Sequence, residues 1–285
     1  MADLAVVVVN FNAGEHLLRC LASLDAHAGG AELEVVVVDN DSVDGSARAA
    51  ADAFPRARVI ETGSNRGFAA GANVGIAATT APFVLVLNPD AEIWEGTLEA
   101  FVKLAAERPG AGAIGPLIRS PDGTVYPSPR EHPSIGVAVG HAFLGPLWPN
   151  NPWSRRYRMA DWDRSGEREV EWISGSAFLL RREALDAVGL LDERFFLYAE
   201  EVDLFRRLRE AGWRVVFTPE LEVLHEGAVS TGRSRRTHLT HSRSVYLYFE
   251  KYHGHGWQGV LLPFARVALR VRAELVALLD RVRGR

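Results

Sequence analysis

A short apolar run that ends abruptly in polar residues constrains the fold of this chain most strongly. Residues 83–87 read Phe-Val-Leu-Val-Leu and are followed at once by Asn88, Pro89 and Asp90. A run that is apolar on both faces is typical of a buried strand in a parallel sheet. Pro89 cannot donate a ladder hydrogen bond, so we expect the strand to end there. Asn88 and Asp90 are therefore predicted to follow the carboxyl end of a central strand, where open α/β sheets bind ligands.

Two oxygen-bearing side chains beside a rigid proline suit a hard divalent cation. Mg²⁺ and Mn²⁺ prefer such oxygen ligands, and either ion would in turn hold a diphosphate. The alternative is that Asn88-Pro89-Asp90 only forms a turn that ends the strand. The rest of the chain bears on which reading holds.

The first half of the chain alternates apolar strands with helical segments. Strands are expected at residues 4–9, 34–38, 58–61 and 83–87, and a helical segment separates each from the next. This alternation predicts a doubly wound, mostly parallel sheet of the nucleotide-binding kind.

Polar side chains follow the first two strands at the positions where phosphate-binding loops usually stand. Neither the glycine pattern of dinucleotide-binding folds nor that of a P-loop is present. Asn10 and Asn12 follow the first strand, and Asp39 and Ser42 follow the second. We expect them to point toward one ligand, and Asp39 could accept the imide N–H of a uracil or thymine ring. The alternative is that the carboxylates only form Asx turns and cap the next helix.

Two segments of the second half depart from regular strand and helix patterns. Residues 127–166 are rich in proline, tryptophan and arginine without a clear period, which indicates either a binding loop or lid or an ordinary surface excursion. Residues 171–182 form a strand pattern that Ser174, Gly175 and Ser176 interrupt. A glycine in such a place indicates close approach of the backbone to a ligand or a neighbour.

Three carboxylates lie close together at the start of a helix expected to run through residue 208. Glu200, Glu201 and Asp203 follow the apolar sequence Phe-Phe-Leu-Tyr at residues 195–198. The helix macrodipole favours acids in a first turn, which accounts for one or two of them. It does not account for the apolar segment that leads to them.

The end of the chain adds a histidine, a basic segment and two helical patterns. His225 follows a predicted strand, where a histidine is more often structural than a ligand. Residues 231–240 indicate either a mobile loop that closes over a diphosphate or a solvated linker. Helices are predicted at 241–252 and 257–283. The leucine, valine and arginine of the second helix suit a membrane interface, and packing on the domain or on a second subunit would look the same.

Composition excludes several classes of protein. The chain has 285 residues, of which 47% are apolar, so it is globular; its net charge of −4 gives no general case for nucleic-acid binding. The single cysteine, Cys20, excludes an internal disulfide and fits a reducing compartment. No basic leader precedes the first apolar run, and no uncharged apolar stretch reaches about 18 residues, so we expect neither a signal peptide nor a membrane span.

Four of these motifs, taken in order, resemble glycosyltransferase family 2, and most of all its bacterial rhamnosyltransferase-type members. They are the strand ends at Asn10 and at Asp39, the glycine-spaced segment 65–75, and Leu87-Asn-Pro-Asp90. The resemblance implies the GT-A fold, a Rossmann-like, mostly parallel α/β sheet flanked by helices, here with a C-terminal helical extension. We expect a glycosyltransferase domain at 1–240 (a nucleotide-sugar half at about 1–118 and an acceptor half at about 119–240) and the extension at 241–285.

The resemblance also implies roles for single residues. It places Asn10, Asp39, Asn65, Gly67, Asn73 and Asn88 at the donor, Ser174 and Gly175 at the acceptor, and Asp90 and His225 on a divalent metal, Mg²⁺ or Mn²⁺. Asn88 stands where the family's Asp-x-Asp motif has its first acid. Glu201 matches the general base, with Glu where Asp is usual, and Glu200 is the alternative.

The resemblance implies a metal-dependent, inverting glycosyltransferase. The expected donor is dTDP-L-rhamnose, and the expected acceptor is a saccharide or lipid-linked saccharide of cell-wall or surface polysaccharide, met in the cytoplasm at the inner face of the cytoplasmic membrane. A UDP-sugar donor and a non-catalytic nucleotide-sugar-binding protein are the alternatives. A nucleotidyltransferase would need a Gly-rich, Lys- or Arg-bearing signature near the N-terminus, which is absent. No nucleic-acid partner is expected. We expect a peripheral membrane contact through 257–285 or a homodimer.

Overall fold

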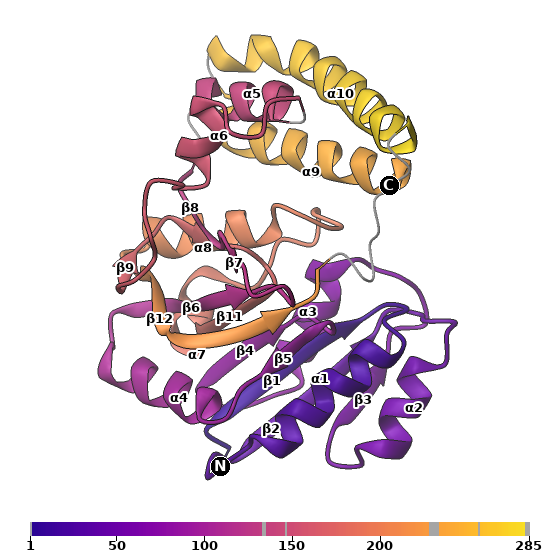
Figure 1. The fold of residues 1–285 in the computed structure, drawn as a ribbon, viewed down its shortest axis with the longest axis vertical. Helices are drawn as coiled ribbons and strands as arrows, with labels where there is room; N and C mark the ends of the chain where they lie inside the picture. The colour runs from indigo at the N-terminus through magenta and orange to yellow at the C-terminus, as the bar shows by residue number, and fades with distance from the viewer. Residues whose placement is uncertain (1, 133–134, 146, 228–233, 256, 283–285) are drawn as a thin grey trace.

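Four parallel strands form the N-terminal half of a central sheet. The structure, a computed structural model, describes residues 2–132, 135–145, 147–227, 234–255 and 257–282 (Figure 1). The strands lie in the order β3-β2-β1-β4. Their bounds are β1 Leu4–Asn10, β2 Leu33–Asp39, β3 Arg58–Glu61 and β4 Phe83–Leu87. All residues of β1 and β4 are buried, as expected for apolar runs covered on both faces. The four strands predicted from the sequence are thus confirmed.

The second half of the sheet is mixed. β11 (Ala177–Arg181) runs antiparallel to β4 and is followed by β6 (Ala111–Arg119), β12 (Arg214–His225) and the edge strand β5 (Ala91–Ile93). β7 (Val125–Tyr126) and β9 (Arg168–Glu169) pair with β6 and β12, and β8 (Pro129–Arg130) pairs with β10 (Trp172–Ile173) as a separate ribbon. The strand predicted at 171–182 is therefore divided between two sheets at Ser174–Ser176.

Helices cover both faces of the sheet and bury its alternate residues. The core on one face joins Leu4, Val6 and Val8 of β1 to helices α1 (Glu15–Ala26), α2 (Ser46–Ala53) and α4 (Thr97–Glu107). The core on the other face joins Ala5, Val7 and Val9 to α3 (Phe68–Ala77), α7 (Arg182–Val188) and α8 (Glu200–Glu210). Because helices cover both faces of the sheet, a ligand is expected to bind at the ends of its strands.

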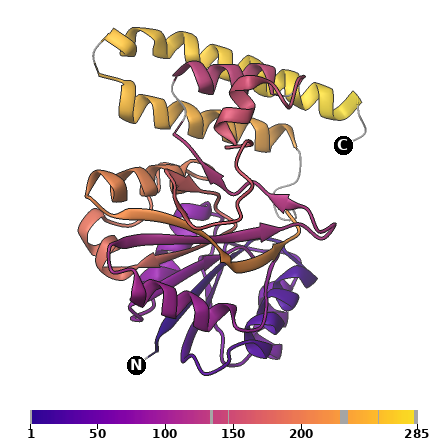
Figure 2. The same ribbon diagram turned by 60° about the vertical axis from the view of Figure 1, so that its left-hand side comes forward.

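A layer of helices lies beyond the mixed half of the sheet, away from α1 and α2 (Figures 1 and 2). It consists of α5 (Ile135–Leu144), α6 (Pro152–Tyr157), α9 (Arg235–His253), the 3₁₀ turn η1 (Trp257–Leu261) and α10 (Leu262–Val282). The described residues of segment 127–166 thus include two helices and a strand, although the apolar residues of this segment follow no clear helix or strand period. None of the helices in the described ranges is long and apolar enough to cross a bilayer.

The polar composition of the basic segment 231–240 suggested a loop, but part of this segment is helical. Residues 231–233 lie outside the described residues, and α9 begins at Arg235. The hydroxyl of Ser234 caps this helix by accepting the N–H of Thr237 at 3.1 Å. Arg235 pairs with Glu274 of α10, so the charges stabilise a helix pair. The boundary expected at residue 240 falls inside α9, and the division into domains stays a prediction.

Candidate active site

The predicted donor residues at the ends of β1 and β2 are in direct contact. Parallel pairing places Asn10 opposite Asp39, and Nδ2 of Asn10 donates to Oδ1 of Asp39 at 2.7 Å. The other oxygen of Asp39 accepts the N–H of Ser42 at 3.0 Å. Oδ1 of Asn10 is buried and has no partner within the described residues. A buried acceptor without a partner at a strand end fits a site that a ligand completes.

The glycine-spaced segment joins this corner to the segment before the acids. Nδ2 of Asn40 donates to the carbonyl of Gly67 at 2.9 Å, and Asn65 accepts the N–H of the same glycine at 3.0 Å. Gly67 has φ +88°, and a Cβ there would lie 2.2 Å from the carbonyl oxygen of Phe196. Only glycine fits this left-handed, crowded position.

Asn73 serves the same junction from within α3. Its Nδ2 donates to the carbonyl of Leu191 at 2.9 Å and to Glu193 at 3.0 Å, and its Oδ1 accepts the N–H of Leu191 at 3.0 Å. The amide is therefore engaged by the chain itself and holds segment 191–193 against α3. A direct contact between Asn73 and a donor stays a prediction.

The predicted metal residues converge beyond the end of β4. Nε2 of His225 lies 3.2 Å from Oδ1 of Asp90 and 3.2 Å from Nδ2 of Asn88. Antiparallel pairing of β5 with β12 places His225 opposite Ala91. A carboxylate oxygen and an imidazole nitrogen fit a divalent ion whose other ligands are diphosphate and water oxygens. No group of three or more acidic, histidine or cysteine side chains able to hold a metal occurs in the described part of the chain.

The predicted acceptor loop connects the metal corner to the acids. The carbonyl of Ser176 accepts the N–H of Asn88 at 2.9 Å. A Cβ on Gly175 would lie 3.6 Å from Oε1 of Glu201, so the backbone of this loop passes directly beside that carboxylate. The N–H of Ser174 donates to the carbonyl of Ser128 at 3.1 Å, which ties the loop to the residue that precedes β8. The three predicted parts of the site are therefore contiguous.

Two buried carboxylates begin α8. One oxygen of Glu200 and one of Glu201 are buried without a partner within the described residues. Burial raises the pKa of Glu201 to about 7, and backbone N–H groups and Arg130 act in the opposite direction. Burial and the neighbouring Glu201 also raise the pKa of Glu200 well above its ordinary value. A carboxyl group whose pKa lies near 7, as that of Glu201 does, can exchange a proton with a substrate at physiological pH.

The backbone before these acids is strained. Tyr198 and Ala199 both have φ +70°, a conformation that L residues rarely adopt. Consecutive residues of this kind persist only where the surroundings hold them, and they cluster at functional sites. Helix α8, which carries both carboxylates, begins directly after this turn.

Asp203 has a structural part. It is fully buried and accepts hydrogen bonds from Arg207 at 2.8 Å and from the hydroxyl of Tyr252 at 2.6 Å. Nζ of Lys251 lies 2.5 Å from the same oxygen that Tyr252 contacts. Asp203 thus fixes α8, which carries the acids, to α9 of the helix layer.

Two arginines of the site were not identified from the sequence. Arg130 is 6% exposed, and its guanidinium lies within 5.8 Å of the ring centres of Tyr126, Tyr157 and Trp172. It stands in the segment that showed no period. Arg19 of α1 pairs with Glu92 and Glu226, which flank Asp90 and His225. The sequence could place Arg19 on a helix but could not show its partners, because these pairings span up to 207 positions.

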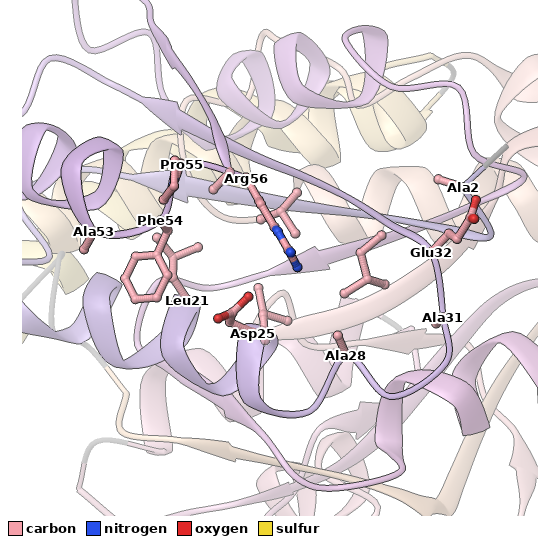
Figure 3. Close-up of a pocket in the computed structure, with 14 residues that line it drawn as sticks. Ala2, Leu21, Asp25, Ala28, Ala31, Glu32, Ala53, Phe54, Pro55 and Arg56 are labelled. Carbon is pink, nitrogen blue, oxygen red and sulfur yellow. The ribbon is translucent and has the colours of Figure 1, made fainter.

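A cavity of about 670 Å³ lies away from this site (Figure 3). It is bounded by the end of α1, the start of β2 and residues 53–57. The start of β2 is the edge of the sheet opposite to Asp39, and no predicted site residue lines the cavity. Volume alone therefore does not mark the site here; polar strand ends do.

Similarity to known proteins agrees with this geometry. Residues 5–189 match the family model described as Glycosyl transferase family 2. The chain is 42% identical to the N-acetylglucosaminyl-diphospho-decaprenol L-rhamnosyltransferase of Mycobacterium tuberculosis, over 96% of this chain and 92% of that protein. It is 31% identical to the O-antigen biosynthesis protein RfbC of Myxococcus xanthus, over 79% of this chain and 17% of that larger protein.

Solved structures confirm the fold. The mannosyltransferase PcManGT of Pyrobaculum calidifontis, in complex with GDP-Man and Mn²⁺, aligns with 99% of this chain and 75% of its own at a TM-score of 0.59 and 17% identity. GalNAc-T7, with UDP, GalNAc and Mn²⁺, aligns with 97% of this chain and 54% of its own at a TM-score of 0.64 and 16% identity. The GT-A expectation is confirmed, and the chain is a glycosyltransferase that belongs to family 2.

Proposed function

We propose that this glycosyltransferase moves L-rhamnose from dTDP-L-rhamnose to a lipid-linked saccharide of cell-wall or surface polysaccharide. One observation carries the proposal: the buried carboxylate of Glu201, one oxygen of which has no partner within the described residues, lies beside Gly175, where the predicted acceptor loop meets the predicted metal residues. The Mycobacterium tuberculosis relative supports the sugar and the acceptor class, since its name gives both and the two chains align over nearly their full lengths.

The chemistry follows from the arrangement of the side chains. Glu201 takes the proton of the acceptor hydroxyl as this oxygen attacks the anomeric carbon from the face opposite the diphosphate, which inverts the configuration. Its raised pKa makes it a stronger base than an exposed glutamate. Asp90 and His225, with Asn88 beside them, would hold Mg²⁺ or Mn²⁺, which neutralises charge on the leaving diphosphate. Asn88 and the fixed backbone around it keep this corner in place.

The donor corner suits a pyrimidine nucleotide. Asp39 is fixed by hydrogen bonds from Asn10 and Ser42, and a carboxylate retains lone pairs for a further donor. The imide N–H of thymine or uracil would supply that donor. The proposal therefore prefers dTDP, with a UDP-sugar as the alternative within the family.

The acceptor class implies a place of action. A lipid-linked saccharide resides in a membrane, and the donor is a water-soluble nucleotide sugar of the cytoplasm. Cys20 is free and buried, in keeping with a reducing compartment. We therefore place the reaction in the cytoplasm, at the inner face of the cytoplasmic membrane.

A panel of nucleotide sugars tests the proposal. Each donor is incubated with a short-chain lipid diphosphate GlcNAc acceptor and Mg²⁺ or Mn²⁺, and the product is analysed by mass spectrometry and NMR. We expect transfer from dTDP-L-rhamnose with inversion. Preferred transfer from a GDP- or ADP-sugar would refute the base assignment, and donor binding without any transfer would favour the non-catalytic alternative.

A further inference from the structure

The outer face of α10 exposes a continuous apolar stripe. Its members recur three or four residues apart and so share one side of the helix: Phe264, Val267, Val271, Leu275 and Leu278, with exposed fractions from 51% to 71%. The opposite side buries Leu269, Ala273 and Ala277. α10 packs on α9 in this layer, and the stripe is left on the outside. We refer to these five exposed residues as the α10 stripe.

A second apolar group lies in the same layer. α5 and the turn after it expose Val139, Phe143, Leu144, Leu147 and Trp148. Arg272 of α10 donates to the carbonyl of Ala142, so the end of α5 is held against α10. Both views show α5 alongside α10, at the end of the molecule farthest from the N-terminal half (Figures 1 and 2). Tryptophan, as at position 148, is enriched where proteins meet the bilayer interface.

The charges of α10 indicate which kind of partner the α10 stripe binds. Its acids are engaged, because Glu274 pairs with Arg235 and Asp280 with His238. Within the described residues no ion pair involves Arg266, Arg270 or Arg281 of the same helix. A second copy of the chain on a two-fold axis would present the same guanidiniums and no free carboxylate from this helix. Anionic lipid headgroups complement an apolar stripe beside such arginines, and so explain both features.

We propose that the α10 stripe, with its neighbouring arginines, is the surface through which the enzyme lies on an anionic membrane. The proposal deepens the proposed function, because it names how the enzyme meets the bilayer that holds its acceptor. The layer is fixed to the site: Ser244 of α9 donates to the carbonyl of Leu197 at 2.8 Å, and Tyr252 binds Asp203. Seating α10 on lipid therefore sets the orientation of the carboxylates relative to the membrane.

Vesicle flotation with the full chain tests the proposal without using turnover. The vesicles are phosphatidylcholine with about one quarter phosphatidylglycerol, an anionic fraction chosen to give an appreciable surface potential. The triple variant Val267→Ser, Val271→Ser and Leu275→Ser should partition at least about 10-fold more weakly, because it removes apolar area that enters the interface. These side chains are exposed, so the fold is retained. The matched control, Val43→Ser with Val125→Ser, changes exposed valines elsewhere and should partition as the wild type does.

A second arm tests the charges. Arg270→Glu with Arg281→Glu should weaken binding to the anionic vesicles and leave binding to pure phosphatidylcholine nearly unchanged. Arg48→Glu, a change at an exposed arginine of α2, is the control. Salt at about 1 M should weaken wild-type binding, because it shortens the Debye length to about 3 Å.

Three results would overturn the proposal. They are a wild-type chain that ignores anionic vesicles, a triple variant that floats as the wild type does, and a wild-type dimer that the triple variant turns into a monomer in sedimentation while vesicle binding is retained. The last result would assign the stripe to a homodimer. Transfer to a water-soluble acceptor is measured in parallel, so failure of the membrane surface and failure of the rhamnosyltransferase proposal give different results.

Discussion

Gly67 and Phe196 are in backbone contact although 129 positions separate them. The carbonyl of Phe196 accepts the N–H of Phe68 at 2.8 Å, and the α-carbon of Gly67 faces the same carbonyl. The contact joins the start of α3, on the donor side, to the strained turn that leads to Glu200 and Glu201. A side chain added at Gly67 would therefore press against the turn that precedes the carboxylates.

Gly67→Ala should impair both stability and transfer. A Cβ at this position would meet the Phe196 carbonyl at 2.2 Å and would also strain a backbone with φ +88°. We expect a loss of about 2–4 kcal/mol in the free energy of unfolding by denaturant titration, together with a lower kcat.

Gly63→Ala is the matched control for this prediction. Gly63 has φ +70°, yet nothing lies within 4 Å of the place its Cβ would take. It should cost about 1 kcal/mol from the backbone alone and leave kcat unchanged. Equal effects of the two alanines would show that the Phe196 contact does not matter.

The elements of the first half could be predicted because their signals are local. Apolar runs with polar ends gave β1, β2 and β4, and the end of each strand gave Asn10, Asp39 and Asp90. Parallel strands bring their carboxyl ends to one edge, so these residues converge without further information. The catalytic role expected of Glu201, with Glu200 as the alternative, came from the family resemblance.

Long-range pairings could not be predicted. The amide of Asn73 binds Leu191, and Arg130 lies in an aromatic surround, only because separate elements meet in space. Arg235, at the start of α9, pairs with Glu274, 39 positions away. Local composition marked that segment as a loop, although the hydroxyl of Ser234 caps the helix that begins there.

Asp203→Asn should lower stability. Its carboxylate is fully buried and binds Arg207, Lys251 and Tyr252, so the change leaves two cations with weakened partners. We expect a loss of about 3–5 kcal/mol in the free energy of unfolding. Asp186→Asn, at an exposed aspartate of α7, should stay within about 0.5 kcal/mol of the wild type. A wild-type melting curve for Asp203→Asn would show that this network does not hold α8 to α9.

The pair of acids should make stability depend on pH. The pKa of Glu201 rises from its ordinary value of 4.5 to about 7 in the folded chain, so between these values the folded state binds more protons than the unfolded state. The free energy of unfolding then falls as pH rises through this window. Glu201→Gln removes the part of this effect that Glu201 contributes and should be more stable than the wild type at pH 8, by on the order of 1 kcal/mol or more, with no such gain near pH 4. Thermal melts across pH check this, and parallel wild-type and variant curves would contradict it.

Donor affinity should depend on a divalent cation through Asp90. Titration calorimetry of dTDP with and without Mn²⁺ should show at least about 10-fold tighter binding with the ion for the wild type. Asp90→Asn keeps the size of the side chain but removes the charge, and should abolish this difference. Asp41→Asn, at an exposed neighbour of the donor corner, should retain it. Equal affinities for all proteins with and without Mn²⁺ would show that donor binding does not need a metal ion.

Steady-state transfer by Glu201→Gln, with donor affinity measured on the same preparation, tests the central claim most directly. Glutamine keeps the size and polarity of the side chain and cannot take the acceptor proton. The account predicts a fall in kcat of about 10²–10⁴-fold with dTDP affinity nearly unchanged, and in the wild type a rise of kcat/KM with pH through about pH 7. If Glu201→Gln retains near-normal turnover while Glu200→Gln is inactive with donor binding intact, the base is Glu200. Normal turnover in both variants would contradict the account.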